Sequence, residues 1–99
     1  MKKKIAILGS TGSIGKTLIE IIKKDPKKFD ILLLTANKNY KEIYKQAKIL
    51  KVKNLIINDE LSYNKLKKKN LSNINIYNNY SSFNKIFKKK IDYVMSSIS

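Results

Sequence analysis

Three glycines near the start of the chain have the spacing of a phosphate-binding loop. Gly9, Gly12 and Gly15 lie in the run GSTGSIG, which directly follows the apolar run 5–8 (IAIL). An amphipathic helix pattern begins at once after the loop. In this order of strand, glycine loop and helix, the unpaired N–H groups and the positive dipole end of the helix favour an anion. The loop therefore predicts binding of a phosphate-bearing ligand.

The spacing of the glycines favours a dinucleotide as this ligand. Gly9 permits the tight turn out of the strand, Gly12 lets the backbone approach a pyrophosphate, and Gly15 lets the helix pack close to the strand. The pattern G-x-x-G-x-x-G differs from the common G-x-G-x-x-G fingerprint and is a variant that tends to accompany NADP.

Two other interpretations of the loop stay open. Residues 10–17 fit the P-loop of nucleotide triphosphatases, G-x-x-x-x-G-K-[ST], except that Ser10 stands in the first position. A P-loop protein also uses an acidic residue after an apolar strand to help hold magnesium. Asp92 stands before its strand, and Asp59 lies two residues beyond the strand at 55–57. The second interpretation is that the loop is a glycine turn that binds no ligand.

A second segment, 35–39 (TANKN), bears on the choice of cofactor. Folds that bind NAD usually present Asp or Glu about 20 residues past the loop to accept the ribose 2′-hydroxyl. This segment has no carboxylate. Lys38 would attract a 2′-phosphate, and Asn37 and Asn39 can donate amide hydrogen bonds. The segment therefore favours NADP over NAD, although Asn39 is also a good N-cap for the next helix, with Glu42 three residues on.

Apolar runs without alternation indicate strands buried on both faces, as in parallel sheets. They alternate with helical patterns, which predicts right-handed βαβ units. In the first helix we expect Ile14, Leu18, Ile21 and Ile22 to form the buried stripe. The expected strands lie at 5–8, 31–34, 55–57, 74–77 (at an edge) and around 93–95; the expected helices lie at 13–24, 39–50, 60–69 and 81–87. The fold class expected is α/β, a Rossmann-type doubly wound parallel sheet that is incomplete at the C-terminus.

Composition excludes several kinds of site. The chain has neither cysteine nor histidine, so it offers no thiolate nucleophile, thiolate metal site or imidazole base. The formal charge of +15 is compatible with a nucleic-acid-binding module, but all 22 basic residues are lysine, and Lys, Ile and Asn make up half of the chain. That bias is typical of an AT-rich genome, so we expect no nucleic-acid partner. We also expect no membrane span and a cytoplasmic protein.

The chain resembles the N-terminal domain of the 1-deoxy-D-xylulose 5-phosphate reductoisomerase family. The resemblance spans the chain, although 51–90 match only loosely. The matching segments are 5–15, 26–29, 36–39 and 92–99.

The resemblance implies an NADPH-dependent enzyme of the non-mevalonate isoprenoid pathway. It converts 1-deoxy-D-xylulose 5-phosphate, a sugar phosphate, into 2-C-methyl-D-erythritol 4-phosphate with Mg²⁺ or Mn²⁺. Residues 1–99 would form its NADPH-binding Rossmann domain, in truncated form, and the catalytic and metal residues would lie beyond Ser99. We therefore expect the chain alone to be inactive. The resemblance also implies a homodimer for the full-length protein. The cofactor-binding residues so implied are Thr11, Gly12, Ser13, Ile14, Asn37, Lys38 and Asn39, of which Asn37 departs from the glycine often found there.

Overall fold

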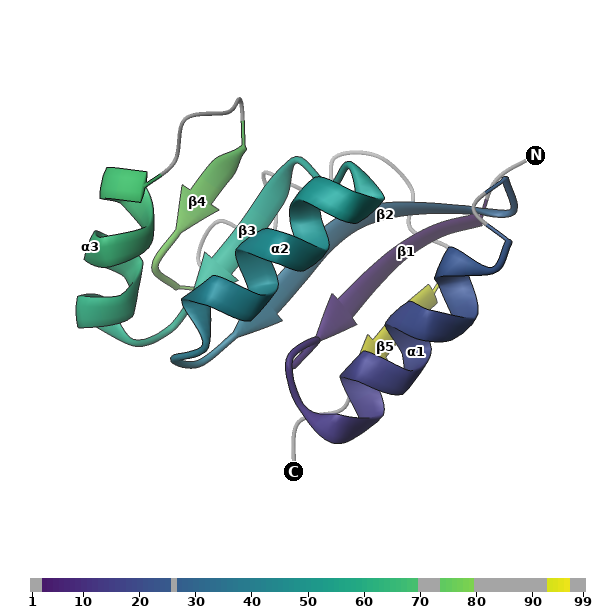
Figure 1. Cartoon of the computed structure of the whole chain (residues 1–99), viewed down its shortest axis with the longest axis horizontal. Coiled ribbons are helices and arrows are strands. Elements are labelled where there is room, and N and C mark those ends of the chain that lie inside the picture. Colours follow the sequence, from purple (N-terminus) through teal and green to yellow (C-terminus); the bar gives the residue numbers. More distant parts are fainter. Residues whose placement is uncertain (1–2, 26, 70–73, 80–92, 97–99) are drawn as a thin grey trace.

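The computed structural model describes residues 3–25, 27–69, 74–79 and 93–96. Strands and helices alternate along the chain as the apolar runs predict (Figure 1). The elements, in order, are β1 (Lys3–Leu8), α1 (Ser13–Lys23), β2 (Phe29–Ala36), α2 (Tyr40–Leu50), β3 (Asn54–Ile57), α3 (Glu60–Lys69), β4 (Asn75–Tyr77) and β5 (Tyr93–Ser96). The helix expected at 81–87 lies outside the described residues.

All five described strands form one parallel sheet in the order β4-β3-β2-β1-β5. The chain moves outward from β1 to β4 and then returns to place β5 on the other side of β1, where Leu8 pairs with Ser96. The strand order therefore reverses between β1 and β5, and ligands of doubly wound sheets bind at this point, beyond the carboxyl ends of the strands. The edge position expected for β4 is confirmed.

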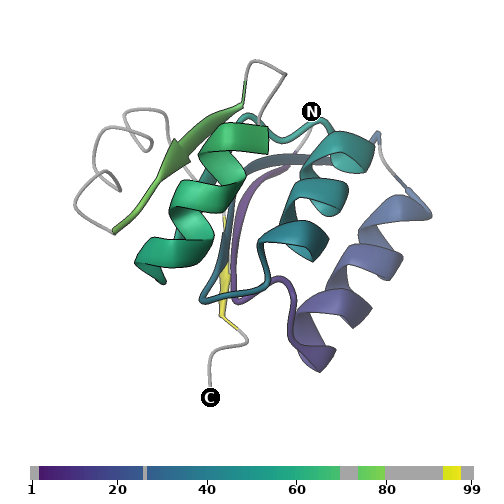
Figure 2. The ribbon, with the colours of Figure 1, turned by 60° about the vertical axis from the view of Figure 1, so that its left-hand side comes forward.

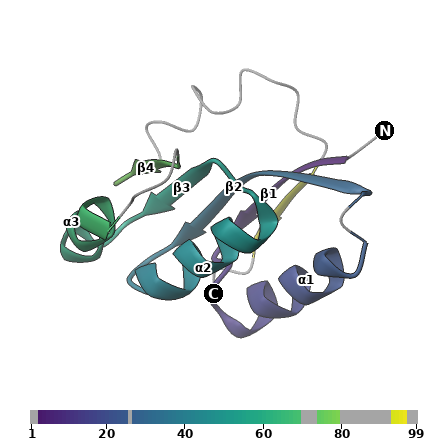
Figure 3. The ribbon, with the colours of Figure 1, turned by 45° about the horizontal axis from the view of Figure 1, so that its top comes forward.

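The three helices of the described residues cover one face of the sheet. Figure 3 shows α1 and α2 side by side beneath the strands, and Figure 2 shows α3 continuing the same layer toward β4. Alternate strand residues, such as Ile5 and Ile7, join the core cluster that these helices complete through residues such as Ile19 and Ile43. The intervening residues Ala6, Leu33 and Ile56 form a second, smaller cluster. Burial on both faces of the strands, expected from the unbroken apolar runs, is confirmed.

The buried stripe expected for α1 is half right. Ile22 is buried and Leu18 packs against the core, but Ile14 and Ile21 are 65% and 55% exposed, and Gly15 and Ile19 are buried in their place. The apolar residues of this helix extend further around its circumference than one stripe, so their spacing does not identify the inward face. The contact between Gly15 and the loop before the helix turns that side of α1 inward.

The ends of α2 combine one expected feature with one that was not expected. Asn39 accepts a hydrogen bond through Oδ1 from the backbone N–H of Glu42 (3.4 Å), which confirms it as the N-cap. At the other end Lys51 adopts a left-handed conformation with φ 58°. There the N–H of Val52 bonds to the carbonyl of Ala47 (2.9 Å) and closes the helix, as in a Schellman motif, a position at which glycine is usual.

Candidate functional site

The glycine loop after β1 and the 37–39 loop after β2 lie at the same edge of the sheet, because the two strands are parallel neighbours. Two hydrogen bonds join the start of the glycine loop to the end of β2. Thr35 accepts both: its carbonyl from the N–H of Ser10 and its Oγ1 from the N–H of Gly9, each at 2.9 Å. The two segments that the sequence singled out are therefore brought to one edge of the fold.

Two of the three glycines have a direct structural reason. Gly9 has φ 75°, a left-handed conformation that turns the chain sharply out of β1. At Gly15 an added Cβ would lie 2.4 Å from the carbonyl oxygen of Gly9 and 2.7 Å from backbone atoms of Ser10. The roles expected of Gly9 and Gly15 in the turn and in close helix packing are thus confirmed. Gly12 is exposed, and an added Cβ would make only an ordinary contact of 3.7 Å.

The N-terminus of α1 has the features of an anion site. No side chain caps it at Gly12, and its first turn contains no acidic residue. The N–H groups of the first turn are unpaired within a helix by geometry, and Gly12 and Ser13 are exposed to solvent there. By contrast, α2 and α3 both begin with a capping side chain and an acidic residue in the first turn. The N–H of Gly12 bonds to the Gly9 carbonyl at 3.3 Å, and the end of α1 keeps the donors of its first turn and its positive dipole available.

The 37–39 loop presents three exposed polar side chains, Asn37, Lys38 and Asn39. Its backbone is held by neighbouring elements, since the N–H of Asp59 donates to the carbonyl of Asn37 at 3.0 Å. Asn39 caps α2 through its Oδ1 only, so among the described residues its Nδ2 donor has no partner. The capping role and a ligand-binding role of Asn39 therefore use different atoms and do not compete.

Asp59, the acidic residue weighed for a P-loop, has a structural task instead. Its carboxylate accepts hydrogen bonds from the hydroxyl (2.8 Å) and the N–H (3.0 Å) of Ser62 in the first turn of α3. These bonds lower the pKa of Asp59, and the positive charges of Lys38 and Lys65 lower it further. Lys16, which would reach a nucleotide phosphate in a P-loop, lines a groove between α1 and α2. The structure offers no support for the P-loop interpretation.

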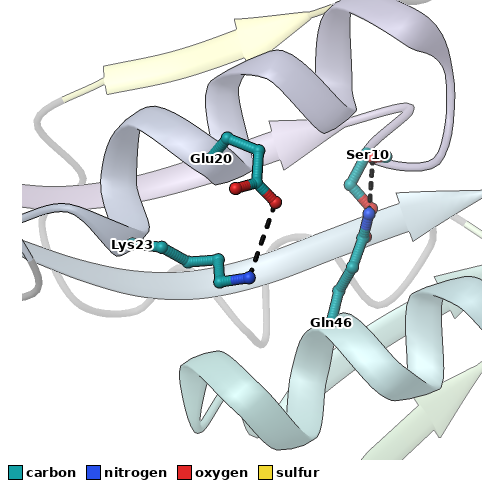
Figure 4. A network of polar contacts seen from close by, with 4 residues as sticks. All are labelled: Ser10, Glu20, Lys23 and Gln46. Carbon is teal, nitrogen blue, oxygen red and sulfur yellow. Dashed lines mark hydrogen bonds and ion pairs between the residues drawn. The ribbon is translucent and has the colours of Figure 1, made fainter.

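Two contacts with the glycine loop have no local signal in the sequence, those of Thr35, within the segment 35–39, and of Gln46. Gln46 comes from α2 and donates its Nε2–H to the carbonyl of Ser10 at 3.0 Å (Figure 4). The figure also shows Glu20 and Lys23, an exposed ion pair of 3.5 Å on α1 that contributes little to stability. The sequence does indicate burial of Gln46, because it lies three residues after Ile43 and next to Ala47, on the apolar stripe of α2.

Within the ranges that the structure describes, no three acidic side chains gather as a metal site would require. No helix in these same ranges has the length and apolar character to cross a membrane.

Comparison with known proteins identifies the family. The family profile described as 1-deoxy-D-xylulose 5-phosphate reductoisomerase matches residues 5–99. The enzyme of that name from Pelagibacter ubique is 53% identical over 98% of the chain, and that from Vesicomyosocius okutanii is 35% identical over 97%. The chain spans only 26% and 25% of the length of these two relatives.

Solved structures of similar fold come from the same family. The reductoisomerase of Zymomonas mobilis in complex with NADPH superposes with a TM-score of 0.87, at 27% identity, over 99% of this chain and 26% of that one. A further reductoisomerase structure, with NADPH, fosmidomycin and magnesium, has a TM-score of 0.85 at 24% identity and supports the fold alone. With its glycine loop, strand order and sequence all in agreement, the chain belongs to the 1-deoxy-D-xylulose 5-phosphate reductoisomerase family.

Proposed function

We propose that residues 1–99 are the NADPH-binding Rossmann domain of an enzyme that converts 1-deoxy-D-xylulose 5-phosphate into 2-C-methyl-D-erythritol 4-phosphate. The observation that carries the proposal is the uncapped N-terminus of α1, which lies where the strand order reverses and has no acidic residue in its first turn. The relative from Zymomonas mobilis binds NADPH on a superposable fold. When bound, NADPH supplies the hydride for the reduction.

The glycine loop and the first turn of α1 would hold the pyrophosphate. Thr11 is half-buried and Gly12 and Ser13 are exposed, so their backbone is accessible to a ligand at the mouth of the loop. The absence of a Cβ at Gly12 permits close approach of the phosphate oxygens. Ile14, which is 65% exposed, offers apolar surface beside them. An apolar residue exposed to this extent at the start of a helix is consistent with contact to a bound cofactor.

Asn37, Lys38 and Asn39 would hold the 2′-phosphate of the adenosine ribose. The loop contains no carboxylate that would repel this group, and Lys38 supplies a positive charge next to amide donors. Asp59 lies near enough to Lys38 for the two charges to interact.

The described residues do not fit a divalent metal, because no cluster of acidic side chains gathers in them. We therefore assign no metal ligand and no catalytic residue to them, and place Mg²⁺ or Mn²⁺ and the sugar phosphate in the part of the family protein that this chain does not span. We also propose a homodimeric, cytoplasmic full-length enzyme without nucleic-acid or membrane partners, as the family resemblance implies.

The substitution Lys38→Ala tests the proposed choice of cofactor. A charge-assisted hydrogen bond is worth about 1.5–3 kcal/mol, which corresponds to a loss of about 10- to 100-fold in NADPH affinity. NADH lacks the 2′-phosphate, so its affinity should not change. Titrations that follow cofactor fluorescence would measure the dissociation constants of NADPH and NADH. They would be made on residues 1–99 and on a chimera in which these residues replace the matching part of the Pelagibacter relative.

A matched control is Lys53→Ala, which removes an exposed lysine at the amino end of β3, the opposite edge of the sheet. This variant should bind NADPH as the unmodified chain does. Added salt should weaken NADPH binding more than NADH binding, because an exposed ion pair is screened. Equal loss of NADH and NADPH affinity in Lys38→Ala would contradict the assignment of the 2′-phosphate to this loop.

A further inference from the structure

We propose that Gln46 is a positioning residue for the cofactor site. By holding the carbonyl of Ser10, it sets the direction of the next N–H group, that of Thr11, at the mouth of the glycine loop. The inference rests on the proposed function, because the loop is taken to receive the pyrophosphate of NADPH.

The contact between Gln46 and Ser10 is buried and joins distant parts of the chain. Ser10 is 0% exposed and Gln46 is 5% exposed, and 36 residues separate them in the sequence. The Nε2–O distance of 3.0 Å is that of a well-formed hydrogen bond. Figure 4 shows the Gln46 side chain extending from α2 directly to the loop. A contact this well shielded from water holds the peptide more firmly than an exposed one does.

The planarity of the peptide bond transmits this contact to the ligand side of the loop. In a trans peptide the carbonyl of one residue and the N–H of the next point in opposite directions. With the Ser10 carbonyl held toward α2, the Thr11 N–H must point away from α2. Within the described chain that N–H has no acceptor. Meanwhile the preceding N–H, that of Ser10, is held by the Thr35 carbonyl on β2. The peptides on both sides of Ser10 are thus fixed by different elements.

Glutamine at this position brings one buried hydrogen bond and one unpartnered atom. Gln46 lies on the face of α2 that also buries Ile43 and Ala47. Its own Oε1, and the Oγ of Ser10, have no hydrogen-bond partner in the part of the chain described by the structure. A buried polar atom without a partner destabilises a fold. An apolar side chain of similar shape would remove the penalty of Oε1 but would leave the Ser10 carbonyl without its donor, so glutamine has no clear advantage in stability. The single bond to the Ser10 carbonyl is therefore the useful contribution of this side chain.

The substitution Gln46→Met tests the proposal, because methionine has a similar length and volume but no donor. We expect little net change in stability toward urea, because the unpartnered Oε1 is removed while the Ser10 carbonyl loses its donor. NADPH binding should weaken by about 3- to 10-fold, the range for one neutral hydrogen bond. The control Ile43→Val alters the same face of α2 one turn away. It should lower stability and leave the NADPH affinity within about twofold, because it removes one methylene from the core and leaves the donor to the glycine loop in place.

A second measurement does not depend on NADPH. In ¹⁵N-labelled protein without cofactor, Gln46→Met should shift the Thr11 and Gly12 amide resonances. It should also speed hydrogen exchange of the Gly12 N–H, which donates to the Gly9 carbonyl at 3.3 Å, while α2 amides stay protected. If the unmodified chain does not bind NADPH, the proposed function fails, and the amide measurement still decides whether Gln46 orders the loop. Unchanged Thr11 and Gly12 amides, or unchanged NADPH affinity in Gln46→Met, would overturn the positioning role.

Discussion

The substitution Gly15→Ala should destabilise the fold even though alanine is the better helix former. The added Cβ would lie 2.4 Å from the carbonyl oxygen of Gly9, about 1 Å closer than the shortest ordinary contact of 3.4 Å. Two further atoms, both in the backbone of Ser10, would lie at 2.7 Å. None of these is the end of a flexible side chain, so relief requires α1 to move away from the loop as a unit.

The magnitude follows from two opposing terms. Overpacking of a well-packed contact costs about 1–3 kcal/mol, and three backbone clashes place this site at the upper end. Replacing glycine by alanine inside a helix returns about 1 kcal/mol. The net loss is therefore about 2 kcal/mol, which is about 1–2 M in the urea midpoint for a chain of this size. Circular dichroism at 222 nm during urea unfolding would measure it.

Gly12→Ala is the matched control. Gly12 has φ −74° and ψ 172°, which alanine adopts without strain, and its added Cβ would make only a 3.7 Å contact. Stability should change by no more than about 0.5 kcal/mol, while NADPH affinity should fall if the pyrophosphate approaches this residue. Should Gly15→Ala prove as stable as the unmodified chain, or more so, the close packing of α1 on the glycine loop would be refuted.

Two further substitutions concern the ends of α2 and α3. Lys51→Gly should raise stability by about 0.5–1 kcal/mol, because glycine adopts the left-handed conformation at φ 58° without the Cβ penalty; a thermal midpoint no higher than that of the unmodified chain would argue against it. Asp59 has a lowered pKa, so its contribution is complete above about pH 4–5 and is lost as the pH falls through that lowered value. The Asp59→Asn variant should therefore unfold with a smaller free energy than the unmodified chain at pH 7, and the difference should shrink at pH 3. Urea unfolding that gave the same difference at both pH values would exclude the ionised carboxylate as the cause.

The amino-acid sequence by itself determined the elements, most of their order and the place of the site. Apolar runs such as 5–8 identify buried strands because the signal is local. The helix at 60–69 was predicted with the bounds observed, and Gly9 was recognised because a sharp turn out of a strand requires a left-handed residue. The position of β5 beside β1, on the side opposite β2, agrees with the general rules for doubly wound sheets.

Only the tertiary structure decided which face of α1 is buried and which side chains hold the glycine loop. The apolar residues of α1 surround too much of the helix to choose a face, and the contact of Gly15 with Gly9 makes the choice. Thr35 and Gln46 reach the loop across 26 and 36 residues of sequence. Local patterns are silent on such contacts, because a hydrogen bond between distant segments depends on how strands and helices pack and not on the residues beside either partner.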